Sequence, residues 1–334
     1  MEQALEPHGA VAGRWKHLYA PIATELSAAE SVLRTELRHN DPFIDSLVKH
    51  AFRLGGKRLR PALLLLSAQA TGEINDSHIK LAAVVEMIHT ATLVHDDVLD
   101  EASLRRHRET INARNDNEAS VLVGDYLFTH AFYLASSLDT TYAARTIGRA
   151  TNIVCSGELR QIHSRGNFAL GEAEYLDIIE AKTAELCACC CRLGAHYAGA
   201  TNDQADMLDR IGRNLGIAFQ IADDTLDLIG DERSMGKSLG TDLAKQKLTL
   251  PVIRLLAETP PDDRDAIIEQ LRSAHRTSRS QIDDRLERTG ALEYARQKAR
   301  AYAAAARADA ERLADSPARD VLVLLTELVV SRQE

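Results

Sequence analysis

The fold is set by one stretch of the chain, LAAVVEMIHTATLVHDDVLD at Leu81–Asp100. The part from Leu81 to Val94 is apolar on nearly every side of a helix. A helix of this kind belongs in the interior of a large bundle and not on its surface. The stretch Ile211–Ile221 has a similar character. Each of the two stretches leads into a cluster of aspartates, and carboxylates at the end of a buried helix need an explanation.

The rest of the chain also favours helices. Its 334 residues include only 18 glycines and 8 prolines, and 4% of them are aromatic. Such a composition is poor for β-sheet and good for helix. We therefore predict an all-α bundle of about a dozen helices, without strands. The expected helices cover residues 14–38, 42–54, 60–71, 77–105, 116–138, 141–164, 172–198, 204–230, 244–257, 263–289, 291–313 and 317–332. No low-complexity linker divides the chain, so we expect one domain over residues 1–334, with 1–20 a loosely ordered segment.

Charge and cysteine content exclude several classes of protein. A net charge of −9 argues against a broad nucleic-acid-binding surface. Four of the five cysteines crowd into Cys187–Cys191, which suits small buried side chains better than a disulfide framework or a metal site. No apolar run reaches the ~20 residues that cross a bilayer, and the N-terminus lacks the pattern of a secretory or transit peptide. We expect a cytoplasmic protein without a transmembrane segment.

Two clusters of three aspartates share one spacing: Asp96, Asp97 and Asp100, and Asp223, Asp224 and Asp227. The first and last members of each cluster are four residues apart and so lie on one helix face. Like charges repel there, most strongly in apolar surroundings, and a cation would offset the repulsion. Mg²⁺ prefers oxygen ligands and is typically held by one or two carboxylates plus substrate phosphates. A similar run at Asp283–Glu287 lies among polar residues and is assigned to solvent.

Basic residues gather near both clusters. They are Lys57, Arg58 and Arg60 after a glycine pair, Arg105, Arg106 and Arg108 after the first cluster, and Lys237, Lys245 and Lys247 after the second. Lysine and arginine bind phosphate as a point charge and as a fork, respectively. Together with two acidic clusters suited to Mg²⁺, they predict a pocket for two diphosphate groups. Metals would bridge one diphosphate, and cationic side chains alone would hold the other.

In this order the motifs resemble the trans-isoprenyl diphosphate synthases, the polyprenyl synthetase family. The two DDxxD motifs, Asp96–Asp100 and Asp223–Asp227, carry the resemblance. It covers roughly residues 25–330 and extends to Gly55–Pro61, Arg105-Arg106, Lys182-Thr183, Phe219-Gln220, Gly236-Lys237 and Lys247–Pro251. The resemblance implies an isoprenoid synthase type bundle around a deep central cavity, in a homodimer, with three Mg²⁺ per active site.

The resemblance also implies a role for each matching residue. The metal ligands would be Asp96, Asp100, Asp223 and Asp227. The allylic diphosphate would be bound by Arg105, Lys182, Thr183, Gln220, Lys237 and Lys247, and isopentenyl diphosphate by Lys57, Arg60, His89 and Arg106. Lys182, Thr183 and Gln220 would be catalytic. In the expected reaction the allylic diphosphate ionises, isopentenyl diphosphate attacks the cation, and loss of a proton yields a product one isoprene unit longer. Water must be excluded, because it would trap the cation.

Product length depends on the helix that leads to Asp96. In the family, a bulky aromatic residue five positions before the motif keeps products short, whereas here that position is Ala91, followed by Thr92. The segment His89–Asp97 resembles long-chain members of the octaprenyl type, which make quinone side chains of about C30–C50. We hypothesise that the cavity floor lies deeper, at Phe128 and Phe132, which share a helix face. Ordinary core packing explains these two phenylalanines equally well.

Four alternatives have different discriminating features. A short-chain farnesyl or geranylgeranyl diphosphate synthase would share the chemistry but stop at C15 or C20. Glu86-x-x-His89 is a motif of di-iron helical bundles, but no second copy lies on a buried helix. A non-catalytic subunit of a heteromeric synthase would lack acidic motifs, and a terpene cyclase would not need Lys57 and Arg60. The preferred primer and the route of product release, including transient membrane contact, stay open.

Overall fold

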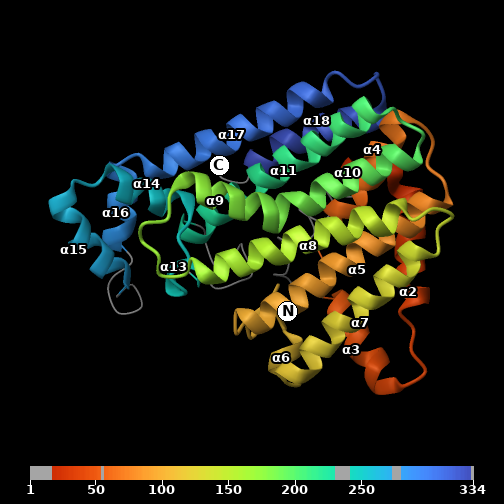
Figure 1. Ribbon diagram of the computed structural model, residues 1–334, viewed down its shortest axis with the longest axis horizontal. Coiled ribbons are helices and arrows are strands. Elements are labelled where there is room, and N and C mark those ends of the chain that lie inside the picture. The colour runs from red at the N-terminus through yellow and green to blue at the C-terminus, as the bar shows by residue number, and fades with distance from the viewer. Residues whose placement is uncertain (1–16, 54–55, 230–240, 273–279, 332–334) are drawn as a thin grey trace, which may run out of the picture. The chain divides into compact units, whose positions relative to one another are not determined.

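The computed structural model describes residues 17–53, 56–229, 241–272 and 280–331. The described chain is almost entirely helical, which confirms the predicted all-α fold class (Figure 1). It divides into two compact units that we describe separately. Unit 1 comprises residues 1–147, 189–209 and 310–322, and unit 2 comprises 148–188, 210–309 and 323–334. The prediction of a single domain stays a prediction, and residues 1–16 of the expected N-terminal segment lie outside the described part.

The elements that lie wholly in unit 1 are η1 (Ala20–Ile22), α2 (Ala23–Glu36), α3 (Pro42–Arg53), α4 (Leu59–Thr71), α5 (Asp76–Leu99), β1 (Leu104–Arg105), β2 (Arg108–Glu109), α6 (Ile111–Arg114) and α7 (Asn117–Ser136). Unit 2 holds α9 (Glu172–Ile179), the π-helical turn η2 (Glu180–Ala184), α13 (Thr241–Ala244), α14 (Leu250–Glu258), α15 (Pro261–Arg272) and α16 (Ser280–Arg288). The boundary between the units falls within five helices: α8 (Tyr142–His163), α10 (Glu185–Tyr197), α11 (Asn202–Ile229), α17 (Ala291–Ala310) and α18 (Pro317–Val330).

Helix α5 is the centre of unit 1, as the sequence predicts. Asn75 caps its N-terminus, because the Asn75 side chain accepts from the backbone of His78 while the His78 ring accepts from the Asn75 backbone N–H. Leu81–Ile88 is buried throughout. The helix packs against α2, α4 and α7, and Figure 1 shows α5 in orange beside α7 in yellow. Burial on all sides explains why this stretch carries apolar residues at every turn.

Contacts at both ends show that α5 and α7 run antiparallel. Near the aspartates, the His95 ring lies 3.1 Å from the Val121 carbonyl oxygen. At the other end of α5, Lys80 Nζ donates to Ser137 Oγ at 3.2 Å. Residues before His95 therefore face residues after Val121. Ala91, one turn below His95, lies level with the turn of α7 that contains Phe128.

The prediction of a helix over 77–105 and the absence of strands are wrong at one place. Helix α5 ends at Leu99, and β1 pairs antiparallel with β2 in a small hairpin. The two residues of its turn, Arg106 and His107, both have left-handed backbones, with φ of 52° and 61°. Such turns usually contain glycine or asparagine, so the sequence lacks the ordinary hairpin signal. Thr110 closes the base of the hairpin by donating its hydroxyl to the Ala102 carbonyl at 2.7 Å.

The predicted helices at 172–198 and 244–257 are interrupted in the structure. The first contains the π-helical turn η2, and the second is two helices, α13 and α14. Within the predicted helix at 263–289 the structure describes α15 and α16, and residues 273–279 lie outside the described part. No helix of the described chain combines the length and the apolar character that a bilayer crossing requires.

We expect Gly194→Ala to destabilise the protein. A Cβ at Gly194 on α10 would overlap the Leu64 carbonyl oxygen on α4. Overpacking of this kind lowers the free energy of unfolding by about 1–3 kcal/mol. Urea unfolding measures the change, with Gly171→Ala as the control, because a Cβ at Gly171 meets nothing within 4 Å. Gly171 is the N-cap residue of α9, and replacing it by alanine should lower the free energy of unfolding by less than about 1 kcal/mol. Equal costs for the two variants would contradict the close approach of α10 to α4.

Candidate active site

The first aspartate motif lies at the C-terminal end of α5 in unit 1. The Asp100 N–H donates to the Asp96 carbonyl at 2.8 Å, so the backbone is helical through the motif. Asp96 and Asp100 are partly exposed and lie on one face, as the spacing predicts. Asp97, about 100° further round the helix, is only 2% exposed. Asp97 Oδ1 accepts from both Nε and Nη2 of Arg105, each at 2.8 Å.

The β1–β2 hairpin brings two arginines back over this helix end. Arg105 reaches the buried Asp97, and the Arg106 guanidinium lies against Gly56, where a Cβ would overlap it. The pair thus connects the motif to the glycine loop, as the predicted diphosphate site requires. Burial lowers the pKa of the Arg106 guanidinium, and the positive charge of Arg105 lowers it further.

The glycine loop is anchored by Arg58, which the sequence places among the basic residues near the first cluster but which the family resemblance gives no individual role. Arg58 has a left-handed backbone, with φ of 53°. Its Nη1 lies 2.5 Å from Glu86 Oε1 on α5, and its Nε lies 3.4 Å from Glu30 Oε1 on α2. Glu86 is only 2% exposed. Burial opposes the charge of Arg58, but the Glu86 and Glu30 carboxylates outweigh that effect and raise its pKa.

This contact removes the di-iron alternative. Glu86 would have to bind metal in a Glu-x-x-His site, but its carboxylate holds the Arg58 guanidinium. His89, the other member of the motif, lies within the influence of several cations. Burial lowers the pKa of His89 well below its usual range, so the ring is neutral near pH 7. Four arginines lower the same pKa further: Arg60, Arg106, Arg105 and Arg58.

The structure therefore brings together three of the residues predicted to bind isopentenyl diphosphate, Arg60, His89 and Arg106. Lys57, the fourth, is exposed beside them in the loop. The Nε of Arg60 is buried and has no hydrogen-bond partner among the residues that the structure describes. A buried donor of this kind fits an anionic ligand, because an unmade hydrogen bond costs about 1–3 kcal/mol.

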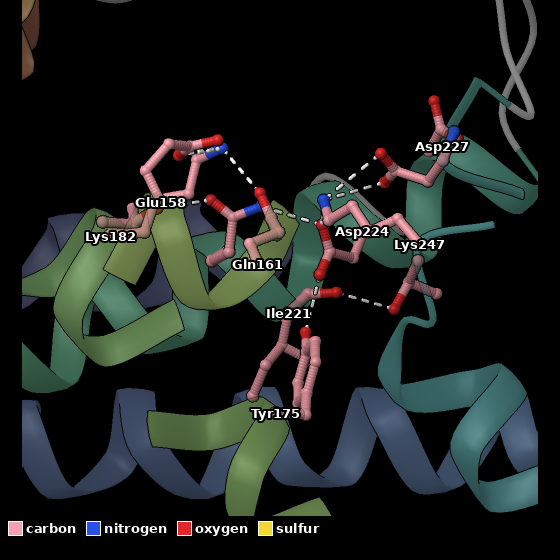
Figure 2. A network of polar contacts seen from close by, with 12 residues as sticks. Glu158, Gln161, Tyr175, Lys182, Ile221, Asp224, Asp227 and Lys247 are labelled. Carbon is pink, nitrogen blue, oxygen red and sulfur yellow. Dashed lines mark hydrogen bonds and ion pairs between the residues drawn. The ribbon is translucent and has the colours of Figure 1, made fainter. Parts of the chain in front are cut away.

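Unit 2 holds the second group of predicted residues, several of which are drawn in Figure 2. Lys182 and Thr183 lie in the π-helical turn η2. Lys182 Nζ contacts Glu158 Oε2 at 2.6 Å and Gln161 Oε1 at 2.7 Å, both from α8. Thr183 donates its hydroxyl to Gln220 Oε1 on α11 at 2.7 Å. These contacts fix both side chains before any substrate binds.

Asp224 is the centre of this network. It is 1% exposed and accepts from the Tyr175 hydroxyl at 2.7 Å and from Gln220 Nε2 at 2.8 Å. Lys247 Nζ lies 3.4 Å from Asp224 Oδ1 and 3.2 Å from Asp242 Oδ1. Burial raises the pKa of Asp224, although the charge of Lys247 opposes the rise. Burial disfavours the charge of Lys247, but the carboxylates of Asp224 and Asp242 raise its pKa far above its usual value.

The two motifs thus share an arrangement that the sequence analysis missed. In each, the middle aspartate is buried and bonded to a basic residue further along the chain, Arg105 for Asp97 and Lys247 for Asp224. The helical period carries the signal, because a residue adjacent to the i, i+4 pair points about 100° away from that pair. Tyr175, Glu158 and Gln161 gave no such signal, since their partners are far away in sequence.

The outer aspartates fit a divalent cation unequally. Asp96, Asp100 and Asp223 are partly exposed and offer the oxygen ligands that Mg²⁺ prefers. Asp227 is 1% exposed and accepts from the Asp242 backbone N–H at 3.3 Å. Within the described ranges, no group of three or more acidic, histidine or cysteine side chains could hold a metal ion. The donor chemistry fits a cation that takes its remaining ligands from water and phosphate.

Left-handed backbone at residues other than glycine lies close in sequence to the predicted site residues of each unit, within the described chain. In the part of the chain that the structure describes, five residues other than glycine have positive φ: Arg58, Glu101, Arg106, His107 and Gln246. Each lies within two residues of a predicted site residue. Strain of roughly 1–3 kcal/mol per residue collects where ligands are bound.

Other predicted residues remain outside these two networks. Lys237 lies outside the described residues. Ala91 is fully buried on α5, and Thr92 is half-buried. The rings of Phe128 and Phe132 are half-buried, with centroids 5.4 Å apart. A cavity of about 590 Å³ in unit 2 is lined by residues of α14, α15 and α16 and their ends, and by none of the predicted site residues.

Comparison with known proteins agrees with this geometry. The family model for polyprenyl synthetases matches residues 41–288. The chain is 37% identical to an all-trans-nonaprenyl-diphosphate synthase (geranyl-diphosphate specific) of Rhodobacter capsulatus, over 94% of this chain and 97% of that protein. It is 34% identical to the octaprenyl diphosphate synthase of Escherichia coli, over 93% and 96%. The crystal structure of a decaprenyl diphosphate synthase from Rhodobacter capsulatus superposes with a TM-score of 0.90, at 36% identity over 96% and 99%.

The chain therefore belongs to the polyprenyl synthetase family. The predicted family, the isoprenoid synthase type fold and the enzyme class, transfer of prenyl groups, are confirmed. A further solved structure, the polyprenyl synthase from Caulobacter crescentus complexed with calcium and isoprenyl diphosphate, is similar at a TM-score of 0.89, with 33% identity over 97% of this chain and 98% of that one.

We expect Asp97→Asn to weaken the binding of an allylic diphosphate about tenfold, because Arg105 loses the charge that fixes its position. The free energy of unfolding should fall by about 1–3 kcal/mol. Isothermal titration with an unreactive allylic diphosphate analogue measures the first effect, and urea unfolding the second. Asp76→Asn, at an exposed position on the same helix, is the control. If Asp97→Asn binds the analogue as tightly as the control does, Asp97 does not position Arg105.

Proposed function

We propose that this protein is a Mg²⁺-dependent long-chain trans-polyprenyl diphosphate synthase. It adds isopentenyl diphosphate to an allylic diphosphate in successive head-to-tail steps and makes a product of about C30–C50, octaprenyl type, for quinone side chains. The observation that carries the proposal is the repeated motif, in which a buried middle aspartate contacts a cation while three of the four outer aspartates, Asp96, Asp100 and Asp223, are partly exposed. Relatives that make octaprenyl and nonaprenyl diphosphates support the long product.

The accessible carboxylates of both motifs suggest where the metal ions bind. Three Mg²⁺ per active site would be held by Asp96, Asp100, Asp223 and Asp227. When bound, these ions neutralise negative charge on the departing pyrophosphate. Of the four aspartates, Asp227 is the least suited to bind a metal ion, because its carboxylate is buried and accepts from the Asp242 backbone N–H.

Basic side chains of the protein bind the two diphosphates together with the metal ions. Arg105, Lys182, Lys237 and Lys247 hold the allylic diphosphate, and Lys57, Arg60, His89 and Arg106 hold isopentenyl diphosphate. These fixed charges stabilise the pyrophosphate as its bond to the allylic carbon breaks. A neutral His89 suits a hydrogen-bonding role among arginines, since a further positive charge there would be repelled.

Thr183 and Gln220 are suited to face the allylic cation. Gln220 Nε2 donates a hydrogen bond to Asp224, which turns Gln220 Oε1 toward Thr183. This oxygen therefore accepts the hydrogen bond from the Thr183 hydroxyl. The lone pairs of the Thr183 oxygen are thereby left to interact with positive charge.

The assembly and location of the enzyme are proposals of the same kind. We infer one helical domain that acts in the cytoplasm as a homodimer, with transient membrane contact when the product leaves. Leu122 and Tyr133 support the dimer, because both are about two thirds exposed on one face of α7, at 67% and 68%. The molar mass measured by light scattering tests this arrangement.

The decisive experiment is incubation of the pure protein with Mg²⁺, farnesyl diphosphate and excess labelled isopentenyl diphosphate. Mass spectrometry sizes the products. We expect a ladder that ends between C30 and C50. A stop at C15 or C20 would retain the chemistry but indicate the short-chain alternative. Absence of elongation by folded protein would overturn the proposed activity of this chain on its own.

We expect Ala91→Phe to shorten the product by at least one isoprene unit. The antiparallel register of α5 and α7 sets Ala91 opposite the residues of α7 that immediately precede Phe128, and Phe132 lies one further turn, about 6 Å, from the aspartates. A ring at Ala91 therefore closes a tunnel above both phenylalanines. Product sizing by mass spectrometry is the measurement.

The converse variant, Phe132→Ala, should lengthen the product, because it opens the space below Phe128. Phe43→Ala is the matched control, since the Phe43 ring on α3 is 59% exposed and its loss should leave product length unchanged. If Ala91→Phe has no effect on length, the growing chain does not pass between these two helices.

A further inference from the structure

The π-helical turn η2 interrupts one otherwise continuous helical segment, between α9 and α10. Glu185 N–H bonds to the Glu180 carbonyl, five residues earlier, where an α-helix would use the carbonyl four residues earlier. The turn carries Lys182 and Thr183, whose side chains have the contacts described above. Such single π turns cost stability and occur mostly at functional sites. Neighbouring residues must therefore hold this turn in place.

One arginine of α11 contacts both ends of the turn. Arg213 Nη1 lies 3.1 Å from Glu180 Oε1 and 2.7 Å from Glu185 Oε2. Residues five apart in an α-helix point about 140° away from each other, so one atom would not readily reach both. The i→i+5 pattern brings them to one side. The contact of Arg213 with both carboxylates is thus specific for the π-helical form.

Two glycines allow the flanking helices to press on the backbone of the same turn. A Cβ at Gly157 on α8 would lie 2.7 Å from the Lys182 backbone nitrogen. A Cβ at Gly216 on α11 would lie 2.5 Å from the Ala184 Cα. Both distances are too short for any side chain. Helices α8 and α11 therefore contact the turn on two sides. The same helices supply the hydrogen-bond partners of Lys182 and Thr183.

We propose that Arg213, with Gly157 and Gly216, forms a clamp that keeps η2 in its π-helical form and so positions Lys182 and Thr183 for the allylic substrate. Arg213 and Gln220 are seven residues apart on α11, about two turns, and so lie on the same side of that helix. One helix thereby fixes both the shape of the turn and the direction of the Thr183 hydroxyl. The clamp residues act only through Lys182 and Thr183, and the proposal rests on the proposed function.

The test compares Arg213→Gln with Arg210→Gln. Arg210 lies one turn away on α11 and bonds to Asp309, which is not part of η2. A misplacement of about 1 Å at a reacting group lowers the rate about 100-fold. We expect Arg213→Gln to lower kcat for the first condensation by 10- to 100-fold, about 1.4–2.7 kcal/mol in the barrier. KM for isopentenyl diphosphate should change less than about twofold, because its predicted ligands are elsewhere. Arg210→Gln should match the wild type.

A purely structural salt bridge would give a different result. It would lower the melting temperature and the folded fraction, but kcat per folded molecule would stay at the wild-type value, and this outcome overturns the clamp. Arg213→Lys, which keeps the charge but not the fork, should recover part of the lost kcat. If the wild type itself elongates no primer, the proposed function fails; if it does and Arg213→Gln is unimpaired, the clamp alone fails.

The glycines give an independent readout. Gly216→Ala should move η2 away from α11 and lower kcat at least as much as Arg213→Gln, whereas Gly171→Ala should not. If Gly216→Ala does not fold, the Arg213 variants still decide the matter. Wild-type kcat in a folded Gly216→Ala protein would contradict the close approach on which the clamp depends.

Discussion

A carboxylate buried at the end of an apolar helix needs a cation, and this requirement organises the chain around both aspartate motifs. Asp97 and Asp224 are almost completely buried, and an unpaired charge there would cost several kcal/mol, roughly. Each is matched by a basic residue that the chain brings back from further along, Arg105 by a hairpin and Lys247 by the segment before α14. The local structures that follow the two motifs differ, but each one supplies a positive charge that neutralises a buried aspartate.

The division of labour within each motif follows from helix geometry. Because the middle aspartate points away from its neighbours, it can pair with a protein cation on the buried side while Asp96, Asp100 and Asp223 lie on partly exposed faces. The cations of the two units are in different states. Around His89, burial and the positive charges of four arginines lower the pKa of the imidazole. Lys182 and Lys247 already contact carboxylates, so a diphosphate bound to them must share these lysines with Glu158 and Asp224.

The regular helices could be predicted because they depend on local periodicity, whereas the metal-binding role of the outer aspartates stays a prediction. Helix α7 was expected at 116–138 and spans Asn117–Ser136. The hairpin that carries Arg106 could not be predicted, since its turn residues have left-handed backbones without glycine or asparagine. The π turn at Lys182 also has no local signal, because it is held by Arg213 and by glycines on other helices. The buried state of Asp97 could have been predicted from its angle to Asp96 and Asp100.

Carboxylates and cations of the candidate site are therefore carried by different kinds of backbone. The aspartates lie on regular α-helix, where a fixed spacing of four residues sets the separation of the outer carboxylates. The cations lie on or beside irregular backbone: the loop at Arg58, the hairpin turn at Arg106, the π turn at Lys182 and the left-handed Gln246 before Lys247. Irregular backbone lets a basic side chain approach a diphosphate from a direction that no helix face provides. Its cost in strain is offset by contacts such as those of Arg58 with Glu86 and of Arg213 with Glu180 and Glu185, so ion pairs that bind no substrate in the proposed reaction still hold the cations in place.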